Sequence, residues 1–107
     1  MQFVVFITVP DEESGVKIAR TLVENKLAAC VNIIKGVRSI YFWEGKVQDD
    51  PELLLVVKTK EYLFDKLKQE VEKIHPYTVP EIIGFKISKS SEKYAKWWDD
   101  VTLKEGE

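Results

Sequence analysis

The chain has 107 residues, the length of one domain, and 45% of them are hydrophobic, enough apolar mass for a single core. Sixteen basic and eighteen acidic side chains give a net charge of -2, so the basic excess that a general nucleic-acid binder needs is missing. No apolar run approaches the ~18 residues of a membrane span, and residues 1–10 lack the basic region and cleavage site of a signal peptide. The single Cys30 cannot form an intramolecular disulfide, so the fold does not depend on an oxidising compartment. Together these features predict one cytoplasmic domain, residues 1–107, that binds neither nucleic acid nor membrane.

Lysine and glutamate dominate the charged residues. Of 34 charged side chains, 14 are Lys and 12 are Glu, whereas Asn and Gln together number five. Proteins of hyperthermophiles tend to show this enrichment together with few thermolabile amides. The composition therefore predicts a thermostable protein.

The N-terminal part of the chain predicts a strand followed by a helix. Residues 3–9 form a continuous apolar run rich in β-branched and aromatic side chains, which is typical of a covered strand. Asp11 can cap the helix that follows. Apolar side chains, Val16 and Val23 among them, then recur at spacings of three and four residues, which predicts an amphipathic helix over residues 12–26.

Two long extended segments follow and predict an unusually long hairpin. Its parts are an arm over residues 28–34 and 37–43 that is bulged near Lys35-Gly36, a tight turn at Glu44-Gly45, and a second arm over residues 46–59 that is disturbed at Asp49-Asp50-Pro51. A usual strand has about 5–6 residues, and arms of this length reach roughly 45 Å at ~3.3 Å per residue. A compact domain of 107 residues cannot cover that length, so part of the hairpin is predicted to project.

The C-terminal part predicts a helix, a strand and a last helix. Thr59 can cap a helix over residues 61–74, residues 82–87 form a fourth strand, and Ser90 or Ser91 starts the final helix. The order β-α-β-β-α-β plus a helix predicts an α+β, ferredoxin-like antiparallel sheet with helices on one face. This fold hosts many unrelated activities, so it decides nothing about function.

Sequence motifs of enzymes are largely missing. There is no GxxxxGK[ST], GxGxxG, GxSxG, CxxC or HExxH, and Cys30 lies in an apolar strand segment that is typical of a buried, inert cysteine. The acidic segment after the first strand, residues 8–13, would repel the phosphate of an acyl phosphate substrate. Residues 53–58 offer no aromatic platform for RNA bases. We therefore expect no catalytic centre.

The segment from His75 to Glu81 is the densest group of candidate functional residues. Pro76 and Pro80 stiffen the six-residue step between the imidazole and the carboxylate. Such a pair suits a divalent metal such as Cu²⁺ or Zn²⁺, but equally an ion pair or a histidine at the negative end of a helix. Because two ligands make only a partial site, the metal-binding and structural interpretations both stay open here.

Three bulky aromatic residues lie at the predicted tip of the hairpin. Strand alternation puts Tyr41 and Trp43 on one face and Phe42 on the other, so at least one of them is exposed. Exposed apolar area of this kind usually marks a contact between proteins. Stacking on nucleic-acid bases is the alternative, but few basic residues are near in sequence. The tip therefore predicts self-association.

Three sequence blocks in the same order resemble the signature of the CutA divalent-cation tolerance family. They are Leu-Ala-Ala-Cys-Val-Asn at residues 27–32, Ser-Ile-Tyr-Phe-Trp-Glu-Gly-Lys at residues 39–46, and His-Pro-Tyr-Thr-Val-Pro-Glu-Ile at residues 75–82. The end of the first strand, Thr8-Val9-Pro10, and residues 94–98 also fit. The resemblance covers essentially the whole chain.

The resemblance implies a ferredoxin-like protomer in a tight cytoplasmic homotrimer, related in architecture to the PII signalling proteins, and a role in tolerance to divalent cations, especially copper. The residues that match the family's proposed cleft are Cys30, His75 and Glu81 as metal ligands, with Tyr41, Trp43 and Lys58 lining it.

This chain also departs from the pattern of some copper-binding members. Ile7 and Ile74 stand where those members carry a cysteine and a second histidine, and neither can ligate copper. We therefore expect no required cofactor and only weak binding of Cu²⁺ or another divalent cation. His75 and Glu81 are predicted to share one cleft with Cys30 nearby, next to a neighbouring subunit's hairpin. A PII-like trimeric scaffold that binds a small ligand or a partner protein is the alternative.

Overall fold

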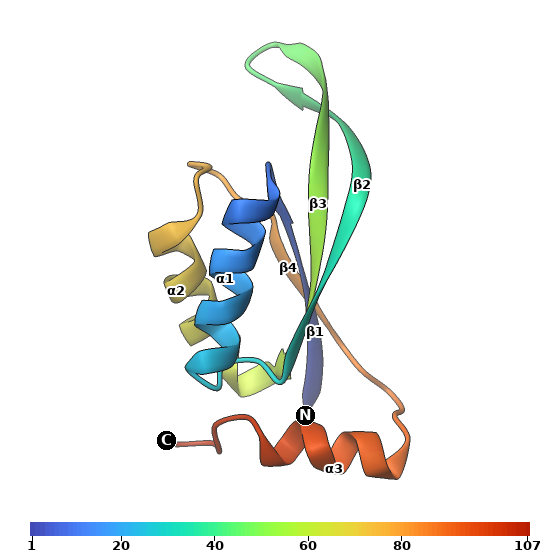
Figure 1. Ribbon diagram of the computed structural model, residues 1–107, viewed down its shortest axis with the longest axis vertical. Helices are drawn as coiled ribbons and strands as arrows, with labels where there is room; N and C mark the ends of the chain where they lie inside the picture. Colours follow the sequence, from blue (N-terminus) through green and yellow to red (C-terminus); the bar gives the residue numbers. More distant parts are fainter.

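A computed structural model describes all 107 residues of the chain as four strands, three helices and one 3-10 turn (Figure 1). In chain order these are β1 (Gln2–Val9), α1 (Glu12–Glu24), β2 (Cys30–Trp43), β3 (Lys46–Lys60), η1 (Glu61–Leu63), α2 (Phe64–Ile74), β4 (Ile82–Lys86) and α3 (Glu92–Asp100).

The strands form one antiparallel sheet in the order β2-β3-β1-β4. Helices α1 and α2 lie together on one face of it, and α3 crosses one end of the sheet (Figure 1). This is the layout of two split βαβ units, so the predicted α+β, ferredoxin-like fold is confirmed.

The main core lies between the sheet and the pair α1 and α2. Every second residue of β1 from Val5 to Val9 is fully buried, as strand alternation requires, and Ile18 and Leu22 of α1 meet them. The predicted apolar face of α1 was partly wrong, because Val16 and Val23 are exposed. Gly15 explains the difference, since a Cβ there would lie 3.3 Å from Val9; the helix approaches the sheet at this glycine.

The long hairpin projects from the sheet as predicted. Strands β2 and β3 pair along their whole length, whereas β1 covers only Leu53–Lys60 of β3, so the rest of the hairpin stands clear of the helices (Figure 1). The bulge near Lys35-Gly36 is confirmed, with Gly36 at a φ of 79°, where glycine avoids the strain of a side chain. The predicted disturbance of β3 at Pro51 was wrong. Pro51 pairs with Arg38, and its missing N–H is tolerated because β3 has no second neighbour at that point.

Thr59 does not cap the second helix, which corrects another prediction. It belongs to β3, where its buried hydroxyl donates to the Leu27 carbonyl at 2.6 Å. The helix starts instead through the 3-10 turn η1, whose first residue follows Lys60 without a side-chain cap. The hydroxyl thus ties the loop after α1 to the sheet.

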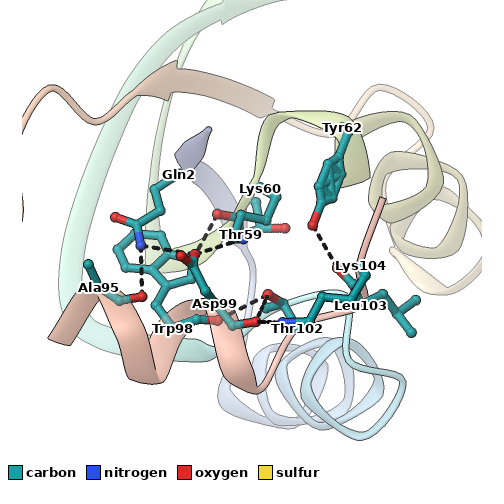
Figure 2. Close-up of polar contacts among 10 residues, drawn as sticks. All are labelled: Gln2, Thr59, Lys60, Tyr62, Ala95, Trp98, Asp99, Thr102, Leu103 and Lys104. Atoms are coloured by element: carbon teal, nitrogen blue, oxygen red, sulfur yellow. Dashed lines mark hydrogen bonds and ion pairs between the residues drawn. The ribbon is translucent and has the colours of Figure 1, made fainter. Parts of the chain in front are cut away.

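Helix α3 is anchored to the sheet by a second, smaller apolar cluster and by polar contacts, which Figure 2 shows. Trp98, 3% exposed, packs with Val4 and Ala29 and donates its indole N–H to the Thr59 carbonyl at 2.8 Å. Beside it the buried Lys60 forms a 2.7 Å ion pair with Asp99. This hydrogen-bonded pair holds the pKa of Asp99 below its usual value, and it fixes the helix in place.

Candidate functional site

A cleft of about 730 Å³ lies between the projecting hairpin and the loop that joins α2 to β4. Its walls come from four parts of the chain: β1, the two hairpin strands β2 and β3, and the loop, whose last residue is Glu81. The residues that line it are Thr8, Ser39, Ile40, Tyr41, Trp43, Glu52, Pro76, Tyr77, Thr78, Val79 and Glu81.

His75 fixes the loop that forms one wall of the cleft. It follows the last residue of α2 and is 8% exposed. The Tyr77 backbone N–H donates to its Nδ1 at 3.1 Å, so Nε2 carries the proton and donates to the Thr8 carbonyl at 2.8 Å. Both ring nitrogens are therefore engaged within the chain, and His75 is not among the residues that line the cleft.

Glu52 is the most buried charged residue of the cleft. It is 7% exposed, and one carboxylate oxygen accepts a hydrogen bond from the Tyr77 hydroxyl at 2.8 Å. No ion pair of the chain includes Glu52. Burial and the adjoining Glu52 carboxylate raise the pKa of Tyr77, so the phenol stays a neutral donor at physiological pH.

Glu81 supplies the second carboxylate of the cleft. The side chain of Glu81 is exposed at the edge of the cleft, yet desolvation by its neighbours raises the pKa of Glu81, and the charge of Glu52 adds to this effect. The Glu52 and Glu81 carboxylates together form a region of negative potential at the cleft.

Tyr41 and Trp43 form the aromatic wall on the hairpin side. Both line the cleft, whereas Phe42, which alternates to the other face, does not and is 71% exposed. The Tyr41 hydroxyl donates to Asp50 across the hairpin at 2.7 Å, and this bond raises the pKa of Tyr41. The contact holds the Tyr41 ring at the mouth of the cleft.

Cys30 and Lys58 lie toward the opposite end of the sheet. They pair with each other across β2 and β3, and the Lys58 amine is 5.6 Å from the ring of Tyr94 on α3. The carbonyl that His75 contacts belongs to Thr8, which pairs with Leu54, four residues along β3 from Lys58. At ~3.3 Å per residue this step is about 13 Å, so one chain does not bring Cys30 to His75 and Glu81. Nowhere in the chain do three His, Cys, Asp or Glu side chains lie close enough together to bind one metal ion.

Glu52 and Tyr77 are cleft residues that the sequence did not single out for a role. Glu52 ends the acidic segment that begins at Asp49, where it reads as a surface charge, and Tyr77 lies inside the block that drew attention to His75 and Glu81. A glutamate on the same strand face as Leu54 and Val56 is the one available signal, because that spacing places a charge among apolar side chains.

The family model described as "CutA1 divalent ion tolerance protein" matches residues 3–101. The chain belongs to the CutA1 family. A CutA1 relative from Thermus thermophilus, "Divalent-cation tolerance protein CutA", is 54% identical over 102 residues, which are 95% of this chain and 99% of the relative. A solved CutA1 structure from the same organism superposes with a TM-score of 0.93 at 51% identity and covers 96% of this chain and 100% of its own.

Another CutA1 relative, "Protein CutA, chloroplastic" from Arabidopsis thaliana, is 48% identical over 99 residues. These residues are 92% of this chain but 54% of that protein. Members of the family thus differ in length, and the name of the Arabidopsis relative also states a location, the chloroplast. Separately, none of this chain's helices combines the length and the apolarity needed to cross a membrane.

Proposed function

We propose that this chain acts in divalent-cation tolerance as a homotrimer that binds divalent cations weakly in the cleft between the hairpin and the loop. The observation that carries the proposal is the Glu52 carboxylate, which is 7% exposed, faces the cleft and has only a neutral phenol as its partner. An ionised carboxylate that is buried without a positive partner is costly. A bound cation removes that cost.

The chemistry of the lining residues favours a cation over an anion. Glu52 and Glu81 offer carboxylate oxygens, and no lysine or arginine lines the cleft. Carboxylate ligands suit hard divalent ions, and at any such site Cu²⁺ has the highest affinity among the first-row divalent ions. Because two carboxylates leave most coordination positions to water, we expect dissociation constants in the micromolar range or weaker.

The other two predicted ligands take different parts in this proposal. His75 holds the loop through Thr8 and Tyr77, and it ligates a metal only if one of these bonds opens. Cys30 would reach the cleft only from a neighbouring subunit, as would Lys58, which pairs with it.

The proposed homotrimer draws on apolar surface that the chain leaves open. The sheet face away from α1 and α2 exposes Ile34, Ile83 and Phe85, and the hairpin exposes Ile40 and Phe42. Exposed apolar area of this kind usually marks a protein interface, and the open strand edges of the hairpin invite pairing with another copy. Three copies are what the resemblance to the CutA family implies.

A PII-like scaffold that binds a small ligand or partner protein is the second candidate. The volume of the cleft, about 730 Å³, supports it, because sites for small molecules span roughly 300–1,000 Å³. Titration with divalent cations against titration with nucleotides separates the two candidates.

We also propose that the protein is cytoplasmic and has no enzymatic activity. The one histidine has both ring nitrogens engaged in the chain, so it is not free to act as a base. The single unpaired Cys30 fits a reducing compartment.

Calorimetric titration of the assembled protein with Cu²⁺ and Mn²⁺ tests the proposed cation site. Glu52→Gln keeps the size and the hydrogen-bonding capacity of the side chain but removes its charge, so we expect at least about tenfold weaker binding. Glu44→Gln, at the exposed hairpin turn, is the matched control and should bind as the wild type does. Equal affinities for the wild type and Glu52→Gln would refute the site.

A further inference from the structure

The cleft has aromatic side chains as well as carboxylates. Tyr41, Trp43 and Tyr77 line it together with Glu52 and Glu81, and no basic side chain does so. Aromatic rings offer apolar surface against which an alkyl chain packs, and carboxylates attract an ammonium group by charge. The two kinds of side chain therefore select the same class of ligand, a cation with an apolar body.

The size of the cleft argues for a ligand larger than a metal ion. A dehydrated divalent ion contacts only the oxygens that ligate it, at about 2.0–2.6 Å, and leaves the aromatic walls uncovered. A cleft of about 730 Å³ instead falls within the range of small organic ligands. The buried Glu52 carboxylate is hydrogen-bonded only to the Tyr77 hydroxyl and lacks a positive partner. An ammonium group supplies such a partner as well as a metal ion does.

We propose that the cleft binds a primary alkylammonium ion, with its ammonium group facing the Glu52 and Glu81 carboxylates and its alkyl chain against the rings of Tyr41 and Trp43. The proposal uses the cleft assigned above but requires no metal. A lysine side chain from a second copy of the chain is the competing occupant of the same chemistry, and it would exclude the free amine.

Pentylammonium is the probe. It is titrated into the assembled protein in buffer that contains EDTA to remove metal ions, and binding is followed through the tryptophan indole N–H signals in two-dimensional NMR spectra. The chain has three tryptophans, so assignment needs only Trp43→Phe and Trp97→Phe. We expect the Trp43 signal to shift with saturation while that of Trp97 on α3, away from the cleft, stays in place. The neutral 1-pentanol and the anion hexanoate should shift the Trp43 signal little.

Two pairs of variants separate charge from packing. Glu52→Gln should weaken pentylammonium binding about tenfold, whereas Glu44→Gln should not change it. Trp43→Ala, in which calorimetry replaces the lost indole signal, should weaken it roughly threefold, as expected for the loss of about one methylene's worth of apolar contact. Phe42→Ala, on the other face of the same hairpin, should leave it unaltered.

Three results would overturn the inference: no saturable shift at Trp43, equal binding of 1-pentanol, or unchanged pentylammonium affinity in Glu52→Gln. If divalent cations still bind and lose affinity in Glu52→Gln while the amine does not bind, the proposed function stands and only this inference fails. If the amine binds and the divalent cations do not, this inference stands and the proposed cation site fails.

Discussion

Replacing Tyr77 by Phe tests how the cleft tolerates its buried carboxylate. The change removes only the hydroxyl that donates to Glu52 at 2.8 Å and keeps the ring beside His75, with centroids 5.0 Å apart. A hydrogen bond to a charged group contributes about 1.5–3 kcal/mol, and the carboxylate that loses its donor is 7% exposed. We therefore expect the free energy of unfolding to fall by about 2 kcal/mol, measured by guanidinium denaturation at pH 7 and one fixed protein concentration.

A double-mutant cycle attributes that loss to the charge. In the Glu52→Gln background Tyr77 still donates, but to a neutral amide oxygen, so the same replacement should cost only about 1 kcal/mol. Tyr62→Phe is the matched control, because the Tyr62 hydroxyl donates to the neutral Leu103 carbonyl at 2.8 Å; it too should cost about 1 kcal/mol. The reasoning fails if Tyr77→Phe costs no more than Tyr62→Phe, or costs the same with Gln at position 52.

Three further predictions concern stability. The hydrogen bond with Lys60 is the main cause of the lowered pKa of Asp99, so the stability that Asp99 contributes is complete above the ordinary Asp pKa of ~3.9 and is lost as pH falls through the lower folded value. In urea titrations from pH 5 to pH 2, the free energy of unfolding should therefore fall less steeply with acid in Asp99→Asn than in the wild type. An equally steep fall in the two proteins would contradict this. Gly84→Ala places a Cβ against the Phe3 ring, too close for the ring to stay where it is, and should lower the free energy of unfolding by about 1–3 kcal/mol through overpacking. An unchanged free energy of unfolding in guanidinium denaturation would contradict this. The Lys/Glu-rich composition predicts a melting temperature above the ~45–65 °C of mesophile domains, which differential scanning calorimetry measures, and a value inside that range would refute it.

Local sequence patterns were enough to predict most of the fold. The glycine in Lys35-Gly36 marked the bulge, the length of the two arms predicted the projecting hairpin, and Asp11 caps α1 as expected by accepting the Ser14 N–H at 2.8 Å. Each of these features depends on residues close together in the chain. For the same reason the role of Thr59 was missed, because its partner carbonyl lies 32 residues away.

The arrangement of the cleft was beyond what the sequence could predict. His75 bonds to a carbonyl 67 residues away, and Tyr77 bonds to Glu52 25 residues away. Both contacts exist because the loop folds over the end of β1 toward the hairpin, which no local pattern specifies. The sequence offered His75 as either a ligand or a structural residue, and only its two hydrogen bonds show how the ring is held.

Crystals of the protein soaked with Cu²⁺, with data collected at the copper absorption edge, test the proposed cation site most directly. The proposal predicts an anomalous peak in the cleft within bonding distance of the Glu52 and Glu81 carboxylates, in each copy of a three-fold assembly. A peak only at Cys30, or a cleft whose Glu52 is paired with a basic side chain of a neighbouring copy, would contradict it.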